Sequence, residues 1–135
     1  RLNLLKGRNY KMNFTQSVNK CFNHYFDFSG RALRSEFWWF ILFQWVGGIV
    51  ASIFDSAFLG HPFTSEDLGP LTIIWHLATC IPTFAVGARR LHDINRSGWW
   101  QLLFITIIGI ILLVVWWATE GENKKNNHGK PINLK

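Results

Sequence analysis

Three long windows of this sequence contain no lysine, arginine, aspartate or glutamate. They cover residues 37–54, 68–88 and 97–119, which are 18, 21 and 23 residues long. At a helical rise of about 1.5 Å per residue, they would extend over about 27, 32 and 35 Å, and the hydrocarbon core of a bilayer is about 30 Å thick. The pattern therefore predicts an all-α membrane protein with three transmembrane helices, at about 37–54, 68–88 and 98–119.

The third window is the most apolar of the three. Between Leu102 and Val115, twelve residues are Leu, Ile, Phe or Val. Side chains of these types favour membrane insertion by about 0.3–0.6 kcal/mol each, so together they favour it by about 4–7 kcal/mol. A soluble fold would have to cover three helices that are apolar on every side, and a chain of 135 residues is too short to do so.

A single polytopic membrane domain is expected over residues 13–123. Residues 1–12, which end at the first methionine, are expected to be a non-native or disordered leader, and residues 124–135 a polar tail. From Phe14 to Phe28, apolar side chains recur at helical spacing with polar side chains between them. This segment predicts an amphipathic helix that lies in the membrane interface before the first span and is ended by Ser29 and Gly30.

The distribution of charge predicts an orientation in the membrane. The formal net charge is +6, and the basic residues flank the hydrophobic windows, which argues against nucleic acid as a partner. The loop at 55–67 has acidic residues and no Lys or Arg, whereas the loop at 89–96 has three arginines. By the positive-inside rule, the N-terminus and the 89–96 loop are predicted to be cytoplasmic.

The position of the tail is less consistent with that rule. Three complete spans would place the tail outside, yet the tail carries Lys124, Lys125, Lys130 and Lys135. A re-entrant third segment bent near Gly109 would return the tail to the cytoplasm. The length of the third window matches one complete span, however, so the sequence favours three spans over a hairpin.

The densest group of polar side chains separates the second and third windows. If the second helix continues past Ala88, then Arg89, Asp93 and Arg96 share one helical face. Ser97 is a candidate N-cap for the third helix, with Asn95 as a second candidate.

Three interpretations of this segment remain open. In the first, the arginines orient the protein and Asp93 pairs with Arg89. In the second, Arg90, Arg96 and the N-terminus of the third helix bind an anionic group such as a lipid phosphate. In the third, His92 and Asp93 act as an acid–base pair, although adjacent residues on a helix point about 100° apart.

Glu36 lies at the start of the first window, at the same depth as the arginine-rich loop. A carboxylate at a membrane boundary is costly unless it is paired, so we expect Glu36 to contact Arg89, Arg90 or Arg96. In a more specific form of this hypothesis, a polar cluster clamps the three helices together on one side. The candidate binding residues are Arg31, Arg34, Glu36, Arg89, Arg90, His92, Asp93, Arg96 and Ser97. Interface anchors are expected at Trp38, Trp39, Trp99 and Trp100.

The same residues carry a resemblance to a known family. The stretch Gly30–Trp38, the pair of stretches Arg89–Asp93 and Arg96–Trp100, and the triplet Gly121–Asn123 follow one another in this order. They resemble three motifs of the bacterial inner-membrane proteins termed "domain of unknown function 805". The resemblance implies a multi-pass protein of the bacterial inner membrane and points to the Arg, Glu36, His92 and Asp93 cluster. It implies no activity.

The leading functional hypothesis is a non-enzymatic module that binds anionic lipid or a protein partner through the cytoplasmic-side cluster. One alternative is a membrane-embedded enzyme that acts on a lipid phosphate, with His92 as general base and the arginines stabilising charge. Another is a subunit of a transporter or channel, which would have to be a homo-oligomer because three spans cannot enclose a pathway. No zinc motif or nucleotide fingerprint occurs in the sequence, so no cofactor, metal or catalytic residue is assigned.

Overall fold

The computed structural model describes residues 11–62 and 66–132, and this part of the chain is helical with no β-strand. The helical elements, in chain order, are α2 (Phe14–Asn23), α3 (Arg34–Leu59), α4 (Pro70–Asp93), the 3₁₀ helix η1 (Gly98–Ile105) and α5 (Ile107–Ala118). Most of the expected leader, residues 1–10, lies outside the described residues. Met12 is described; it is buried, and its N–H donates to Ser35 Oγ at 2.9 Å.

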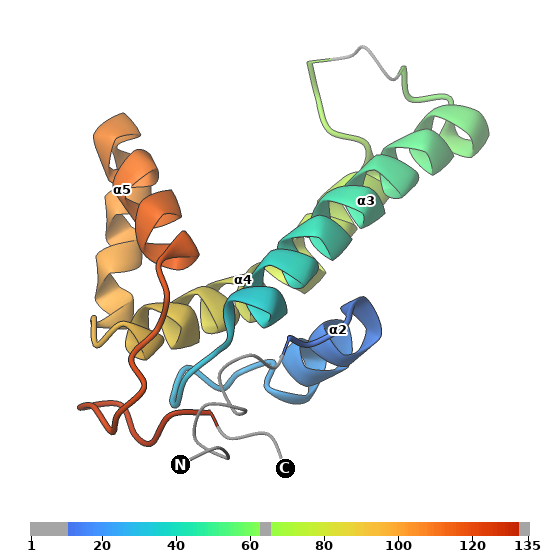
Figure 1. Cartoon of the computed structure of the whole chain (residues 1–135). Coiled ribbons are helices and arrows are strands. Elements are labelled where there is room, and N and C mark those ends of the chain that lie inside the picture. Colours follow the sequence, from blue (N-terminus) through green and yellow to red (C-terminus); the bar gives the residue numbers. More distant parts are fainter. Residues whose placement is uncertain (1–10, 63–65, 133–135) are drawn as a thin grey trace.

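Helices α3 and α4 form one long antiparallel pair (Figure 1). They contain 26 and 24 residues, or about 39 and 36 Å of helix, and both are apolar enough to cross a membrane. These helices confirm the first two hydrophobic windows as helical. Their close contact is possible because Gly47 has no side chain, and an added Cβ would collide with the ring of Trp75.

A buried carboxylate joins α3 to the start of α4. The sequence placed Asp55 in a loop, but it lies within the last turns of α3 and accepts hydrogen bonds from the N–H groups of Leu71 and Thr72, each at 2.9 Å. The Thr72 hydroxyl donates to the same carboxylate at 2.7 Å. These first-turn N–H groups have no partner within α4, so Asp55 acts as its N-terminal cap from a neighbouring helix.

The third window does not form one continuous helix, so the prediction of a third span over 98–119 is wrong. The chain forms η1, breaks at Thr106 in an extended conformation, and returns as α5 alongside η1 (Figure 1). The Thr106 side chain accepts from the N–H of Gly109 at 3.0 Å and thereby caps α5. Gly109 is required here because an added Cβ would collide with the Leu103 carbonyl oxygen.

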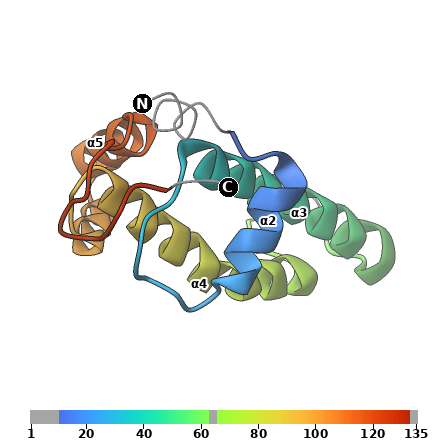
Figure 2. The ribbon, with the colours of Figure 1, turned by 60° about the horizontal axis from the view of Figure 1, so that its bottom comes forward.

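The hairpin reverses the expected position of the tail. At about 2.0 Å per residue for η1 and 1.5 Å for α5, each arm is about 16–18 Å long, roughly half of a bilayer core. The segment after α5 consequently returns to the end of the molecule that holds α2 (Figures 1 and 2). Lys124, Lys125 and Lys130 therefore lie at the same end as Lys20 and Arg31, which removes the conflict with the positive-inside rule.

Helix α2 begins with a capping box, in which the Asn13 and Gln16 side chains each accept a hydrogen bond from the other residue's N–H. It packs across α3 and α4 (Figure 2) and buries Ser17 and Cys21. Phe22 makes an edge contact with Phe40 of α3, with ring centroids 5.8 Å apart. The helix ends at Asn23, earlier than the predicted Phe28, and Gly30 then adopts a positive φ of 80°.

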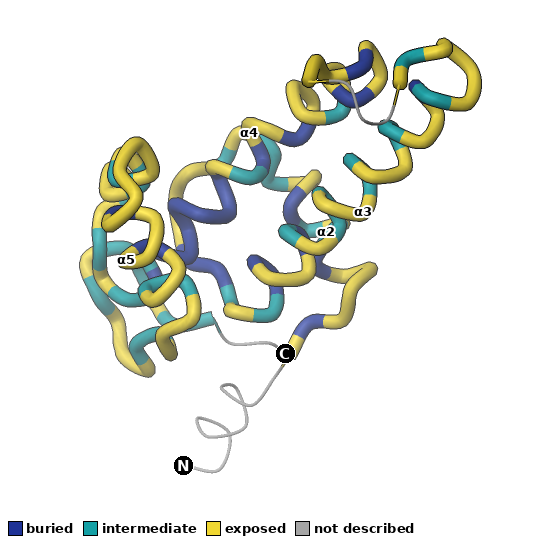
Figure 3. The backbone as a smooth tube through the Cα atoms, turned by 90° about the horizontal axis from the view of Figure 1, so that it is seen from above, coloured by how far each residue is buried: buried dark blue, intermediate teal, exposed yellow. Residues whose placement is uncertain are grey.

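Burial is concentrated where α2, the start of α3 and the end of α4 meet, as Figure 3 shows. The hydrophobic core at this end contains Cys21, Ala32, Phe37, Phe40 and Val86. Elsewhere the helices expose large apolar side chains along their length, such as Leu77 of α4 and Ile108 of α5, which are 68% and 81% exposed. A surface of this kind is expected where the surrounding solvent is lipid rather than water.

Candidate functional site

Glu36 is the centre of a buried ionic group. Its carboxylate is 0% exposed and accepts a hydrogen bond from Arg89 Nη1 at 2.6 Å. Lys20 Nζ lies 3.1 Å from the other oxygen, and the Cys21 thiol donates to the carboxylate at 3.8 Å. The expected contact between Glu36 and one of the three arginines is therefore confirmed, with Arg89 as the partner.

A second ionic group surrounds Asp93 at the end of α4. Arg31 Nε donates to one carboxylate oxygen at 2.8 Å, and Arg90 Nη1 donates to the other at 2.7 Å. The expected pairing of Asp93 with Arg89 is wrong. Arg90, three residues before Asp93, reaches the same carboxylate on one helical face, while Arg89 points to Glu36 on α3.

Arg90 also completes the C-terminus of α5. Its guanidinium donates to the carbonyl oxygens of Trp117 and Thr119, and to that of Ala32 at 3.3 Å. The last carbonyl groups of a helix have no partner within it and carry partial negative charge, so a buried arginine suits this position. The hairpin and the cluster therefore depend on each other, because α5 reaches Arg90 only if the chain turns back at Thr106.

Arg31 holds the tail in the same way. It donates to the carbonyl oxygens of Glu122, Lys124 and Gly129, the last two at 2.9 and 3.3 Å. Gly121 packs against the Asp93 carboxylate so closely that an added Cβ would collide with it. This contact gives a physical reason for a glycine at the start of the Gly121–Asn123 motif.

The groups around Glu36 and Asp93 together form one ionic cluster, which contains more positive than negative charge. Four cations, Lys20, Arg31, Arg89 and Arg90, face two anions, Glu36 and Asp93, which leaves a surplus of two positive charges. Carbonyl oxygens compensate Arg31 and Arg90, as described above. Arg89 Nε and Nη2 are buried and have no hydrogen-bond partner among the described residues, which makes Arg89 dependent on Glu36.

The Cys21 thiol has low nucleophilic reactivity in this environment. Burial, and secondarily the negative charge of Glu36, raise the pKa of Cys21 to about 12 from an ordinary value of 9.0. After the end of α2, hydrogen bonds from Ser29 and His24 lower the pKa of the partly exposed Asp27 from 3.8 to about 2. Cys21 therefore stays protonated at neutral pH and does not act as a nucleophile.

His92 is not oriented by Asp93, so the acid–base pair of the third interpretation does not form, in agreement with the roughly 100° between adjacent residues on a helix. Both Asp93 oxygens are engaged by arginines, and His92 Nδ1 lies 2.9 Å from the carbonyl oxygen of Gly30. The imidazole ring stacks on that of His128 in the tail, with centroids 3.9 Å apart and an interplanar angle of 3°. His92 thus belongs to the contact between α4 and the tail.

The remaining predicted residues lie at the edge of the cluster. Arg34 is exposed and donates to the Ala118 carbonyl oxygen at 3.4 Å, and the Arg96 guanidinium lies 4.1 Å from the ring centroid of Trp116. Ser97 caps η1, as predicted, by accepting from the N–H of Trp99 at 3.3 Å. The four expected anchors are exposed at this end of the helices: Trp38, Trp39, Trp99 and Trp100.

A cavity of about 680 Å³ opens between α4 and η1 beside the cluster. Its lining is mainly apolar and includes Ile81, Phe84 and Leu102, while His92, Ser97 and Gln101 supply polar groups. Gln101 was not predicted; its amide donates to the Phe84 carbonyl oxygen at 3.1 Å. Cavities of this size and composition are typical of sites for amphiphilic or small-molecule ligands.

Several contributors to the site were not predicted from the sequence. Lys20 and Cys21 come from α2, and His128 comes from the tail. The amphipathic pattern indicated that α2 has a buried face, but not that this face meets Glu36. The His128 contact had no local signal, since it depends on the hairpin that returns the tail.

The fold and the site together define a small helical membrane protein whose two spanning candidates are joined at one end by buried ion pairs. The chain belongs to the family described as "Protein of unknown function (DUF805)", whose model matches residues 25–130. The resemblance noted in the sequence is thus confirmed.

Named relatives agree with this assignment. The "Inner membrane protein YhaI" of Escherichia coli (strain K12) is 39% identical over 107 residues, which cover 78% of this chain and 86% of the relative. The "Inner membrane protein YhaH" of the same organism is 38% identical over 111 residues, covering 82% and 90%. The "Uncharacterized protein YiiR" is 33% identical over 102 residues, covering 69% and 58%. No solved structure gives a significant match.

Proposed function

We propose that the chain is a non-enzymatic inner-membrane module that binds an anionic phospholipid between α4 and η1. The observation that carries this proposal is the cavity beside the cluster, which is apolar at Ile81, Phe84 and Leu102 and polar at His92 and Ser97. An acyl chain suits the apolar part and a headgroup the polar part. Arg96 precedes Ser97 in the chain and its guanidinium lies over the Trp116 ring, and we assign it the attraction of an anionic headgroup to this end of the molecule.

The buried arginines have a different role in this proposal. Arg31 and Arg90 are engaged by Asp93 and by carbonyl oxygens, and Arg89 is engaged by Glu36. A lipid phosphate could reach these three side chains only by displacing partners inside the protein. The ionic cluster is therefore the clamp that fixes α3, α4, α5 and the tail, and lipid contacts fall to the side chains at its edge.

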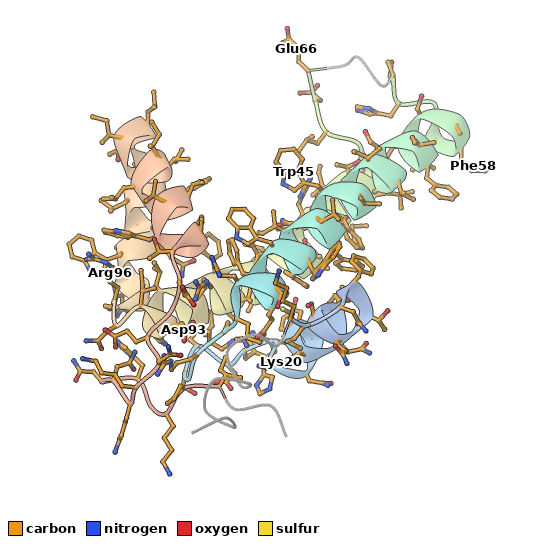
Figure 4. All side chains as sticks on the ribbon, viewed as in Figure 1. Lys20, Trp45, Phe58, Glu66, Asp93 and Arg96 are labelled. Carbon is orange, nitrogen blue, oxygen red and sulfur yellow. The ribbon has the colours of Figure 1, made fainter. Side chains whose placement is uncertain are left out.

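The proposed orientation places this end of the molecule in the cytoplasm. Lys20, Asp93 and Arg96 lie at one end, and Glu66 lies at the other (Figure 4). The segment 60–69 at the opposite end contains no lysine or arginine. By the positive-inside rule, the N-terminus, the 89–96 segment and the tail face the cytoplasm, and η1 with α5 is a re-entrant hairpin entered from that side.

Native mass spectrometry of protein released from native-lipid nanodiscs tests the binding site. Leu102→Trp should fill the cavity and reduce retained phospholipid at least tenfold, whereas Leu112→Trp, on α5 and outside the cavity lining, should retain it. Arg96→Gln should reduce the preference for phosphatidylglycerol over phosphatidylethanolamine. Equal lipid retention by Leu102→Trp and the wild type would contradict the proposal.

The same protein preparations separate binding from catalysis. An enzyme acting on lipid phosphate would use His92, which lines the cavity. Under our proposal, phospholipid incubated with the purified protein is recovered unchanged, and His92→Gln alters retention rather than turnover. Release of inorganic phosphate or a cleaved headgroup by wild type, lost in His92→Gln, would favour the enzyme instead.

A further inference from the structure

A polar face lies in the middle of the α3–α4 pair, far from the ionic cluster. It contains Trp45, Gly48 and Ser52 of α3, at a spacing of three and four residues, together with His76 of α4. These residues line a groove of about 300 Å³. Trp45 is 70% exposed and projects from α3 on the side away from α2 (Figure 4).

The depth of this face makes its polarity unusual. Trp45 is 11 residues beyond the start of α3, so it lies about 16 Å along a helix whose surroundings have a hydrocarbon core of about 30 Å. Tryptophan normally lies at the membrane–water boundary, where the other exposed tryptophans of this chain are expected. An ionisable ring such as His76 in mid-membrane normally faces a protein partner or an aqueous cavity.

Gln44 also lines the groove and accepts a hydrogen bond from Thr83 at 3.2 Å, but three other polar side chains of this face have no such partner within the described part of the chain. No hydrogen bond is formed by the Trp45 indole N–H, by the Ser52 hydroxyl or by either nitrogen of the exposed His76 among residues 11–62 and 66–132. Lipid acyl chains cannot supply donors or acceptors, so leaving these groups exposed to them is unfavourable. A partner that covers the face must therefore offer both hydrogen-bond donors and acceptors.

We infer that the occupant of this face is the same face of a second copy of the chain, related by a two-fold axis. The face contains both a hydrogen-bond donor and hydrogen-bond acceptors. The protruding Trp45 indole can only donate, and the His76 imidazole and Ser52 hydroxyl in the groove can accept. In a two-fold contact each Trp45 enters the other copy's groove above Gly48, and its N–H donates to His76 or Ser52. Such a self-complementary patch is what an isologous interface requires.

Gly48 adds no side chain of its own to the groove. An added Cβ at Gly48 would be in ordinary van der Waals contact with the His76 ring, 3.4 Å from Cε1, so a small side chain would fit there without displacing that ring. Gly47 differs, because its Cβ position is occupied by the Trp75 ring of the same chain. Of the two adjacent glycines, the contact between α3 and α4 requires only Gly47, and we assign Gly48 to the contact between copies.

Cysteine cross-linking in native membranes tests this interface directly. In a Cys80→Ser background, Ser52→Cys should give a cross-linked species with the mass of two chains. Val50→Cys is the matched control, at nearly the same depth but lining the apolar groove on another side of α3. Equal cross-linking of the two variants, no cross-linking of Ser52→Cys, a product containing a different protein, or a ladder of larger oligomers overturns the two-fold interface.

Substitutions then test which groups hold the dimer. Trp45→Leu and His76→Leu each remove a hydrogen-bonding group but keep the face apolar, and each should lower the dimer fraction in mild detergent at least fivefold. Gly48→Leu should do the same by filling the groove, while Val50→Leu should have no effect. A dimer that persists unchanged in Trp45→Leu and His76→Leu, or a monomer that retains lipid in the groove, overturns the proposal.

Discussion

The Arg89 guanidinium donates to the Glu36 carboxylate at 2.6 Å across 53 residues of sequence. Glu36 is in the first turn of α3 and Arg89 is in the last turns of α4. Each charge therefore has the sign that its own helix end favours. Because both side chains are almost completely buried, the pair fixes the relative position of the two long helices at the end where the tail also docks.

Glu36→Gln should strongly destabilise the protein. The substitution leaves Arg89 buried without a carboxylate, and two of its nitrogens already have no partner among the described residues. Breaking one side of a buried pair typically costs about 3–5 kcal/mol of unfolding free energy, whereas an exposed pair contributes about 0–1 kcal/mol. Unfolding by sodium dodecyl sulfate in mixed micelles would measure the loss.

The exposed Glu66→Gln is the control for this experiment, since Glu66 lies at the other end of the molecule (Figure 4). The double variant Glu36→Leu with Arg89→Leu should recover most of the stability, because neither charge is then left unpaired. A loss of less than about 1 kcal/mol in Glu36→Gln would place the pair in the range of surface ion pairs and contradict the clamp.

Asp55→Ala should destabilise the opposite end of the same helix pair. The carboxylate accepts three hydrogen bonds at the start of α4, and loss of an N-cap typically costs about 0.5–2 kcal/mol. The same unfolding assay should show a similar loss for Thr72→Val, which removes one donor. If Asp55→Ala unfolds like Glu66→Gln, the cap is not contributing to stability.

The hairpin predicts which segments face the same side of the membrane. Single cysteines at Asn95 and Lys125 should react with a membrane-impermeant maleimide from the same side, and a cysteine at Glu66 from the other. The physical reason is that η1 and α5 turn back at Thr106, so the tail returns to Arg31. Labelling of Lys125→Cys and Glu66→Cys from one common side would instead support three complete spans.

The sequence was sufficient for the parts of the fold that depend on long uninterrupted patterns. The charge-free windows gave the two long helices, and the cost of an unpaired carboxylate near the membrane correctly linked Glu36 to an arginine. Ser97 was recognisable as a cap because a hydroxyl directly before a helix start has a local hydrogen-bonding role. Each of these features is determined by residues close in sequence or by one strong energetic term.

The features that were not predicted depend on tertiary contacts, or on a local helix break that a long apolar run conceals. Thr106 and Gly109 break the third window, but an apolar run of this strength outweighs one Thr in any average of hydrophobicity. The choice of Arg90 rather than Arg89 for Asp93 depends on where α5 and the tail dock, and neither was placed correctly by a three-span topology. One error in the third segment therefore altered both the fold and the expected site.

Cys21 should show an alkaline shift in reactivity that reports burial beside Glu36. With a pKa of about 12, only about one thiol in a thousand is ionised at pH 9, whereas a thiol of ordinary pKa is about half ionised there. In a Cys80→Ser background, Cys21 should react with iodoacetamide several hundredfold more slowly at pH 9 than the exposed reference Asn19→Cys in a Cys21→Ser chain.

The raised pKa of Cys21 also means that the folded state holds this proton more tightly than the unfolded state does. Its contribution to stability should therefore be complete below about pH 9.0 and be lost as the pH rises toward about 12. If Cys21 and the Asn19→Cys reference react with iodoacetamide at rates within tenfold of each other at pH 9, the Cys21 thiol is not enclosed by α2 and α3.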